Sequence, residues 1–350
     1  NLTPEEVEAK LKEQLPHAVR LKVPSGSTVF TDQVRGEVKV DNANLDDSVL
    51  LKSDGYPTYH LANVVDDHVM GITHVIRGEE WLPSTPKHIL LYQAFDWTPP
   101  VFAHLPNVLN DKRAKLSKRR DGEAVWLSTY QQQGYLPQAM VNFLALLGWH
   151  PKDNQELFTL GELEQAFTLE RVQKAGAIFN LVKLNWFNAE YLKKLPLEKL
   201  DELLQPHYQE LQATLGRQVP QTSALTALLR DRLTTPASVK EHAAWFFKSQ
   251  PELSRELLIP KNSTAAKTLQ ALSLAQGVLE QLSTWSSDDL RNALEVLVRP
   301  GTFSRAELLW PVRVALTGER QSPDVFDVAS ALGRPEALAR LKQAERLLTN

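Results

Sequence analysis

The chain contains no cysteine among its 350 residues, so neither a disulfide bond nor a thiolate metal site can form within it. Apolar residues never run together for the roughly 18 positions that a membrane-spanning helix needs. No signal-peptide pattern stands at the start. These absences predict a cytoplasmic protein without a membrane partner. The formal charge is only −3, which excludes a uniformly basic nucleic-acid binder but permits local phosphate-binding patches.

A methionine start is also missing. The chain opens with residues 1–6, NLTPEE, a pattern typical of a helix N-terminus rather than of the beginning of a protein. From this opening we expect a truncated or processed chain. Hydrophobic residues make up 43% and charged residues 23% of the sequence, which is ordinary for a globular protein with two or three domains.

The first part of the chain mixes strand and helix patterns. A helix from Pro4 to about Leu15 precedes two strand-like runs, Ala18 to Val23 and Thr28 to Val40. A helix is then expected over Tyr59 to Met70. A strand follows over 72–76. Thr85-Pro86 then opens a helix that runs to about residue 95, and a second strand covers 101–104. This order predicts parallel strands with helices on the sheet, as in one half of a doubly wound domain.

The second part of the chain is helical by its spacing. Apolar residues follow the 3.6-residue period over 197–208, 224–233, 238–247, 265–282, 288–298 and 305–317, with two more helices opening at Ser322-Pro323 and Arg334-Pro335. We place a boundary near Leu195-Pro196. The predicted fold class is therefore α/β, a partial doubly wound (Rossmann-like) domain, followed by a predominantly α-helical C-terminal region.

Residues 107–122 are polar and basic, which predicts a loop. At its centre stands Lys115-Leu116-Ser117-Lys118-Arg119. Lysine is a compact ammonium on a mobile stem, so two lysines around a serine can follow the shifting charge of a reacting triphosphate. An isolated basic pentamer is more often a solvated charge run. The strand, helix and strand that precede this pentamer favour the phosphate-binding interpretation.

A second candidate site combines Tyr59, Asn63 and Arg77. Tyr59 and Asn63 are four residues apart on a predicted helix, so they share one face. Arg77 follows a strand and lies at its carboxyl end, where open α/β sheets bind ligands. An arginine there can hold a carboxylate with two parallel hydrogen bonds. Asp66 and Asp67, on the same helix, are interpreted as surface carboxylates or as structure on the tRNA side.

The segments 53–68, 76–81 and 115–119 resemble, nearly residue for residue, bacterial-type glutamyl-tRNA synthetases, which are class I aminoacyl-tRNA synthetases. Residues 135–149, 179–186 and 309–318 also resemble this family, so the likeness spans essentially the whole chain. It implies a glutamate pocket, an ATP site and two catalytic lysines. The residues concerned are Tyr59, Asn63 and Arg77 for glutamate; Glu80, Trp81, Val108, Lys115, Ser117, Lys118 and Arg119 for ATP; and Lys115 and Lys118 for catalysis.

The resemblance also implies a domain order and a set of partners. Residues 1–50 would end an inserted acceptor-binding domain, 51–106 would form the second half of the Rossmann-like catalytic domain, 107–195 a stem-contact domain with the KLSKR loop, and 196–350 the helical anticodon-binding region. The expected activity is that of a glutamate-tRNA ligase, with ATP and Mg²⁺, glutamate and tRNA(Glu) as its ligands. A monomer is expected, with no zinc site in these residues.

One departure from the family pattern is the absence of its Gly-rich, His-containing turn, which clamps ATP. We therefore expect this chain alone to be inactive. A non-catalytic tRNA-binding fragment or module remains the alternative. The long helical region argues against the shorter relative of this family that glutamylates a tRNA base. It also argues against a glutaminyl-tRNA synthetase, because those enzymes end in β-barrels. Whether tRNA(Gln) is also a substrate stays open.

Overall fold

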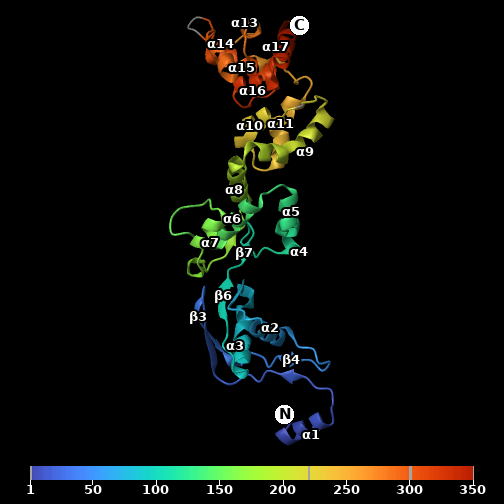
Figure 1. Ribbon diagram of the computed structural model, residues 1–350, viewed down its shortest axis with the longest axis vertical. Helices are drawn as coiled ribbons and strands as arrows, with labels where there is room; N and C mark the ends of the chain where they lie inside the picture. Colours follow the sequence, from blue (N-terminus) through green and yellow to red (C-terminus); the bar gives the residue numbers. More distant parts are fainter. Residues whose placement is uncertain (1, 220, 299–301, 350) are drawn as a thin grey trace. The chain divides into compact units, whose positions relative to one another are not determined.

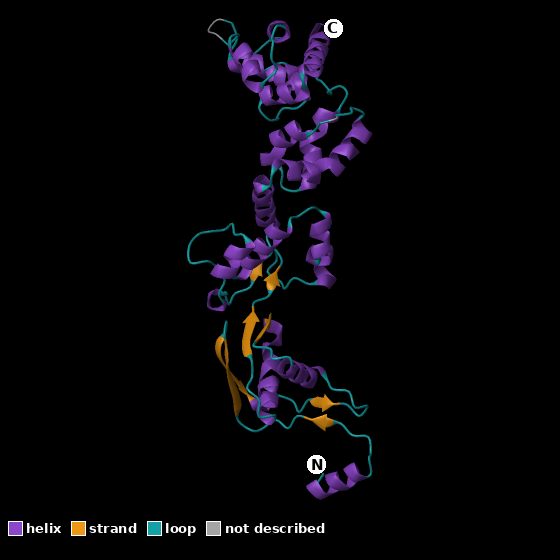
Figure 2. Ribbon diagram, in the orientation of Figure 1, coloured by secondary structure: helices purple, strands orange, loops and turns teal. Residues whose placement is uncertain are grey.

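The computed structural model describes residues 2–219, 221–298 and 302–349. The chain forms two compact units. The first contains residues 1–126 and 141–181, and the second contains residues 127–140 and 182–350. Every strand assigned in the described residues belongs to the first unit, whereas the second is built of helices (Figure 2). The predicted fold class, an α/β part followed by a helical region, is confirmed.

The first unit is organised around a four-stranded sheet with the strand order β3-β2-β6-β5. β5 (His74–Gly78) and β6 (Val101–Leu105) are parallel, as predicted, and α3 (Thr85–Ala94) connects them. α2 (Tyr59–Val69) and α3 lie beside β6 (Figure 1). Val64 of α2, Leu91 of α3 and Phe102 of β6 are buried in one apolar cluster, which fixes these helices on the sheet.

The run predicted as one strand over 28–40 is a hairpin of β2 (Ser27–Asp32) and β3 (Gly36–Asp41). Asp32 forms the turn, because its Oδ1 accepts the backbone N–H groups of Val34 (3.0 Å) and Arg35 (2.8 Å). Gly36 follows at φ +84°, which suits glycine. β2 also pairs with β6 in parallel through Asp32 and Phe102. The hairpin thus shares a sheet with strands beyond residue 50, where the sequence analysis had placed a domain boundary.

Short elements complete the first unit. α1 (Pro4–Lys12) begins with a capping box between Thr3 and Glu6. β1 (Val19–Arg20) pairs with β4 (Val49–Leu51), and β7 (Val108–Leu109) pairs with β8 (Ala177–Ile178). The remaining elements of this part are η1 (Asn42–Asn44), η2 (Glu79–Ser84), α4 (Lys118–Asp121), η3 (Gly122–Val125), α6 (Pro137–Gly148), α7 (Leu160–Ala166) and η4 (Leu169–Arg171).

The second unit has its own apolar core, formed by its helices. The buried guanidinium of Arg340 hydrogen-bonds to the backbone carbonyls of Trp245, Leu316 and Lys248, which end neighbouring helices. The helices are α5 (Leu127–Gln132), α8 (Leu181–Lys194), α9 (Leu197–Leu215), α10 (Ser223–Leu229), η5 (Arg230–Arg232), η6 (Pro236–Ser238), α11 (Val239–Phe247), α12 (Arg255–Leu258), α13 (Ala265–Glu280), α14 (Ser287–Glu295), α15 (Arg305–Thr317), α16 (Val325–Leu332) and α17 (Arg334–Thr349).

Candidate active site

Arg77 lies at the carboxyl end of β5, the edge predicted to bind a ligand. Two of its three guanidinium nitrogens are held: Nε donates to Nε2 of His104 (3.1 Å), and Nη2 donates to the hydroxyl of Thr85 (2.9 Å). Nη1 is buried and has no hydrogen-bond partner. Burial lowers the pKa of Arg77, and nearby Tyr59 and the carboxylates Asp67 and Asp32 oppose that shift. The guanidinium is therefore a fixed cation with one unsatisfied donor.

His104 connects Arg77 to a buried carboxylate. Its Nδ1 lies 2.6 Å from Oδ2 of Asp32, and both side chains are completely buried. Burial alone would raise the pKa of Asp32, but hydrogen bonds from His104 and from backbone amides lower it. Burial lowers the pKa of His104, and Asp32 offsets only part of this. His104 is accordingly a neutral ring that donates from Nδ1 to Asp32 and accepts at Nε2 from Arg77.

Aromatic rings cover the guanidinium. The Tyr59 and Trp81 rings are 5.1 Å apart, and Arg77 lies 6.0 Å from the Trp81 ring. Asn63 lies one turn after Tyr59 and one turn before Asp67 on α2, so the three share one helix face. Asp67 is partly buried, and burial raises its pKa while Arg77 opposes the rise. Tyr59 and Arg77, both predicted for glutamate, thus lie together, and Asn63 is on the helix face of Tyr59. Asp67, interpreted as a surface carboxylate, belongs to the same group.

The segment predicted as a basic loop is more ordered than expected. Residues 115–116 fold back on β7, where the backbone N–H of Leu116 donates to the carbonyl of Val108 (2.8 Å). Nζ of Lys115 forms an ion pair with Glu80 (2.7 Å), which lowers the pKa of Glu80. Asp121 accepts the backbone N–H of Ser117 (2.8 Å) and closes the turn. Lys115 and Glu80, both predicted to lie beside ATP, are therefore in direct contact, and the same segment is hydrogen-bonded to Val108.

Lys118 and Arg119 extend into solvent from α4. Nζ of Lys118 lies 4.7 Å from the centre of the Trp126 ring, within cation–π distance. Lys115, by contrast, is paired with a carboxylate. The structure therefore places the two motif lysines in different surroundings, and Lys118 is the more weakly held of the two.

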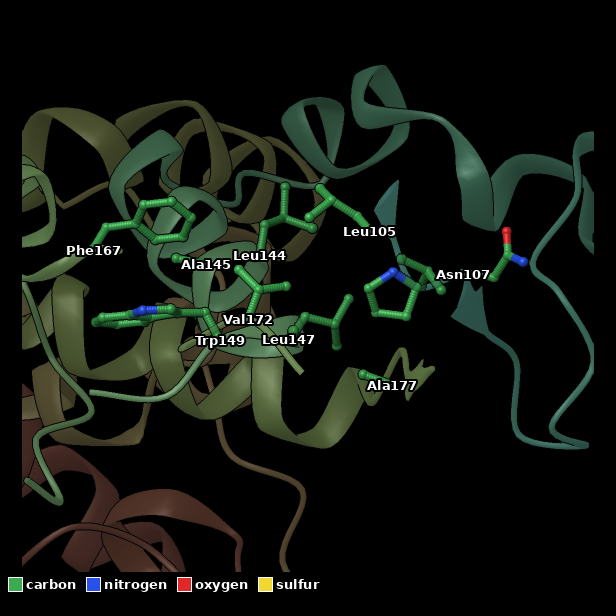
Figure 3. A pocket seen from close by; sticks show the side chains of 12 residues that line it. Leu105, Asn107, Leu144, Ala145, Leu147, Trp149, Phe167, Val172 and Ala177 are labelled. Atoms are coloured by element: carbon green, nitrogen blue, oxygen red, sulfur yellow. The ribbon is translucent and has the colours of Figure 1, made fainter. Parts of the chain in front are cut away.

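An apolar cavity of about 190 Å³ lies behind the Leu105–Val108 segment. Figure 3 shows Trp149 and Phe167 on one side of it and Leu105 and Asn107 on the other. The indole Nε1 of Trp149 is buried without a hydrogen-bond partner. Of the residues predicted for the site, only Val108 lines this cavity.

Four residues beside Arg77 and Val108 were not predicted from the sequence. Asp32, His104 and Thr85 hold Arg77 directly or through one another. Glu79 accepts from the backbone N–H (3.0 Å) and the side chain (2.9 Å) of Asn107 and also pairs with an arginine of the β2–β3 turn. One signal for His104 was available, because parallel strands 72–76 and 101–104 end at the same sheet edge; Arg77 and His104 are indeed register partners.

Thr85 was expected to cap its helix. The chain instead enters α3 through the 3-10 turn η2, so Thr85 lies inside the helix and no side chain caps its start. This leaves the Thr85 hydroxyl free to contact Arg77, His104 and the carbonyl of Trp81.

None of the helices in the part of the chain that the structure describes is both long and apolar enough to cross a membrane. Within the same residues, no group of three or more histidine, aspartate or glutamate side chains is arranged to hold a metal ion.

Comparisons with known proteins match both parts of the chain. Residues 1–186 match the family described as "tRNA synthetases class I (E and Q), catalytic domain", and residues 170–345 match "Anticodon binding domain". The "Glutamate--tRNA ligase" of Alkaliphilus metalliredigens is 41% identical over 355 residues, covering 98% of this chain and 70% of that protein. The protein of the same description from Clostridium botulinum (strain Loch Maree / Type A3) is 40% identical, again over 98% of this chain and 70% of its own length.

Solved structures give the same result. The crystal structure of a glutamate tRNA ligase from Elizabethkingia meningosepticum, in complex with its amino acid, superposes with a TM-score of 0.82 at 34% identity. The match covers 99% of this chain and 72% of that one.

Proposed function

Because the chain belongs to the glutamate-tRNA ligase family of class I synthetases, we propose that its residues take part in converting glutamate and ATP into glutamyl-adenylate and in transferring the glutamyl group to the 3′ end of tRNA(Glu). In the first step the α-carboxylate of glutamate attacks the α-phosphate of ATP. An acyl–phosphate bond forms, the bond to the β-phosphate breaks, and pyrophosphate leaves. In the second step a ribose hydroxyl of the tRNA displaces AMP.

The observation that carries this proposal is the buried Nη1 of Arg77 without a hydrogen-bond partner. A buried unpaired donor on a charged group is costly, and a ligand that accepts from it removes the cost. A carboxylate can accept from Nη1 and from the second proton of Nη2 at the same time. Tyr59 is 48% exposed, so a small movement of its ring would open Nη1 to the side chain of a bound glutamate, which Asn63 would help to enclose.

ATP would lie between the Trp81 side of this group and the KLSKR segment. Lys115 and Lys118 would neutralise the charge that grows on the phosphates as pyrophosphate departs. The ion pair with Glu80 would hold Lys115 until the triphosphate competes for it. Mg²⁺ would enter as the ATP complex. The remaining contacts would come from Glu80, Trp81, Val108, Ser117 and Arg119.

The tRNA would be bound by the helical part of the chain. The match of residues 170–345 to an anticodon-binding family supports this assignment, as does the separate core of the second unit. We retain the domain order of the sequence analysis as a proposal: 107–195 for the stem of tRNA(Glu) and 196–350 for the anticodon. We also propose a cytoplasmic monomer.

A direct test replaces Arg77 by Ala in a polypeptide that carries these residues and is active in pyrophosphate exchange. Loss of a charged hydrogen-bond donor to a carboxylate costs about 1.5–3 kcal/mol. The kcat/KM for glutamate in pyrophosphate exchange should therefore fall roughly 10- to 150-fold, while the KM for ATP stays within about twofold. The exposed Arg20 gives the matched control, since Arg20→Ala removes an arginine outside the site and should leave both values unchanged. Unaltered glutamate kinetics in Arg77→Ala would sink the proposal.

A further inference from the structure

A buried chain of hydrogen bonds joins three neighbouring strands of the sheet. It runs from Asp32 on β2 through His104 on β6 to Arg77 on β5. The side chains of Asp32 and His104 are 0% exposed, so neither can touch a substrate. Any influence that they have on the reaction must pass through the residues that they hold, of which Arg77 is the one proposed to bind glutamate. Thr85 supports the same guanidinium from α3, at 2.9 Å from Nη2.

We infer that Asp32 and His104 are positioning residues that orient the Arg77 guanidinium toward the side-chain carboxylate of glutamate; this rests on the function proposed above. A neutral histidine carries its proton on one ring nitrogen and accepts at the other. Asp32 holds that proton on Nδ1, and Nε2 is thereby kept as an acceptor for Nε of Arg77. With Nε and Nη2 both fixed, the planar guanidinium has one orientation, in which Nη1 remains available.

The His104 ring contacts one carboxylate oxygen of Asp32, which makes the inference testable. Oδ1 accepts from the turn amides of Val34 (3.0 Å) and Arg35 (2.8 Å). Oδ2 accepts from Nδ1 of His104 (2.6 Å), and the backbone N–H of His104 is shared between Oδ2 (3.1 Å) and Oδ1 (3.3 Å). An asparagine can keep its oxygen on the turn amides, but its –NH₂ then faces His104. That donor favours the opposite tautomer of His104, protonated on Nε2, which can no longer accept from Arg77.

The experiment uses Asp32→Asn, with two readouts. In the 350-residue chain, ¹⁵N NMR of the His104 ring should show Nδ1–H in the parent protein and Nε2–H in Asp32→Asn. In the polypeptide that is active in pyrophosphate exchange, the KM for glutamate should rise at least tenfold while the KM for ATP stays within about twofold. Asp41→Asn is the matched control, because Asp41 lies on the neighbouring strand β3, is exposed and caps a turn without contacting His104. It should change neither readout.

His104→Gln supplies a rescue. The glutamine oxygen can occupy the position of Nε2 and accept from Arg77 whatever stands at residue 32. We expect His104→Gln to restore most of the glutamate affinity to Asp32→Asn, so that the double variant binds glutamate within about threefold of His104→Gln alone. A merely structural role for Asp32 would produce no such rescue, and the loss would persist in the double variant.

The outcomes separate this inference from the proposed function. Normal glutamate kinetics in Arg77→Ala would overturn both. A glutamate defect in Arg77→Ala with parent-like kinetics in Asp32→Asn would overturn the positioning role alone. The same would follow if Asp32→Asn raised the KM values for ATP and glutamate equally, or if its His104 kept the Nδ1–H tautomer.

Discussion

Arg77 and the two lysines of the KLSKR segment carry the same charge in different settings. Arg77 is partly buried and fixed by His104 and Thr85, whereas Lys115 and Lys118 are exposed on long side chains. A fixed planar cation suits the side-chain carboxylate of glutamate, whose charge does not move during activation. Mobile ammonium groups suit phosphates, because their charge shifts toward the leaving pyrophosphate. The settings of these residues therefore match the tasks proposed for them.

Lys118→Ala should slow adenylate formation with little effect on tRNA affinity. One lost charged donor to a developing phosphate charge typically costs about 2.7–4 kcal/mol, or roughly 10²–10³ in rate. Pyrophosphate exchange at saturating ATP and glutamate measures this loss. Lys112→Ala is the control, since Lys112 is an exposed lysine of the same basic segment outside the pentamer. If the two variants exchange pyrophosphate equally fast, Lys118 has no part in the chemistry.

Sequence patterns and the family resemblance nominated the residues proposed to contact the ligands but not those that hold them. Tyr59 and Arg77 stand out because a helical face and a strand end restrict where such side chains can go. Asp32 lies before a turn inside the strand-like run from Thr28 to Val40, and Thr85 has the appearance of a helix cap. Their roles depend on pairing across the sheet, which local spacing does not encode. The supporting residues therefore required the three-dimensional structure.

The packing of α2 against α3 includes a pair of histidines. Nδ1 of His60 and Nε2 of His88 are 3.0 Å apart, and both rings lie near Tyr59. His88 is buried, and this burial, with the nearby positive charges of Arg77 and Lys87, lowers its pKa to about 3. The folded protein therefore keeps His88 neutral at pH values where an unfolded chain would protonate it.

Stability of the α2–α3 layer should consequently fall as the pH decreases below about 6.5, the ordinary pKa of histidine. His88 has a depressed pKa in the folded state, so its contribution is fully present above the unfolded pKa and is lost as the pH falls toward about 3. Between pH 7 and pH 5 the loss amounts to about 2 kcal/mol. Hydrogen exchange of the α3 amides, corrected for intrinsic rates, measures it.

His88→Gln provides the comparison for this pH effect. Glutamine can place a polar atom where Nε2 of His88 meets His60, but it does not titrate. The variant should lose about 2 kcal/mol less than the parent protein between pH 7 and pH 5. An identical pH dependence in both proteins would show that protonation of His88 does not destabilise this layer.

Elements were predictable where one periodicity dominated a long segment. The helical spacing over 265–282 and 305–317 corresponds to α13 and α15 because each buries an apolar stripe against its neighbours. The β2–β3 hairpin and the short helix α4 were not anticipated. Both depend on side-chain hydrogen bonds to nearby amides, from Asp32 and Asp121, which compete with the pattern of apolar residues.

The two units differ in how completely their apolar side chains are buried. The helical unit has a continuous core of buried residues from Leu192 to Leu348. In the sheet of the first unit, β5 is an outer strand, and Ile76 on it is 52% exposed. An outer strand with exposed apolar side chains is a site for further pairing. Because the helical unit has a complete core and the sheet has an open outer strand, we expect RNA binding and catalysis to depend differently on the rest of the protein.

The 350-residue polypeptide should bind tRNA(Glu) but form no glutamyl-adenylate. Its helical unit has a core of its own, so RNA binding should persist and weaken steeply with added salt, as phosphate contacts do. The polypeptide spans 70% of the length of its relatives. The Gly-rich, His-containing turn that the family resemblance implies for ATP is not found in its sequence, so we expect ATP to meet only part of its binding site. Filter retention of tRNA between 50 and 200 mM salt and pyrophosphate exchange test the two statements on one sample. A polypeptide extended to the length of its relatives is the positive control for exchange. Robust exchange by residues 1–350 would mean that Arg77, Lys115 and Lys118 suffice without that turn, contrary to the mechanism proposed here.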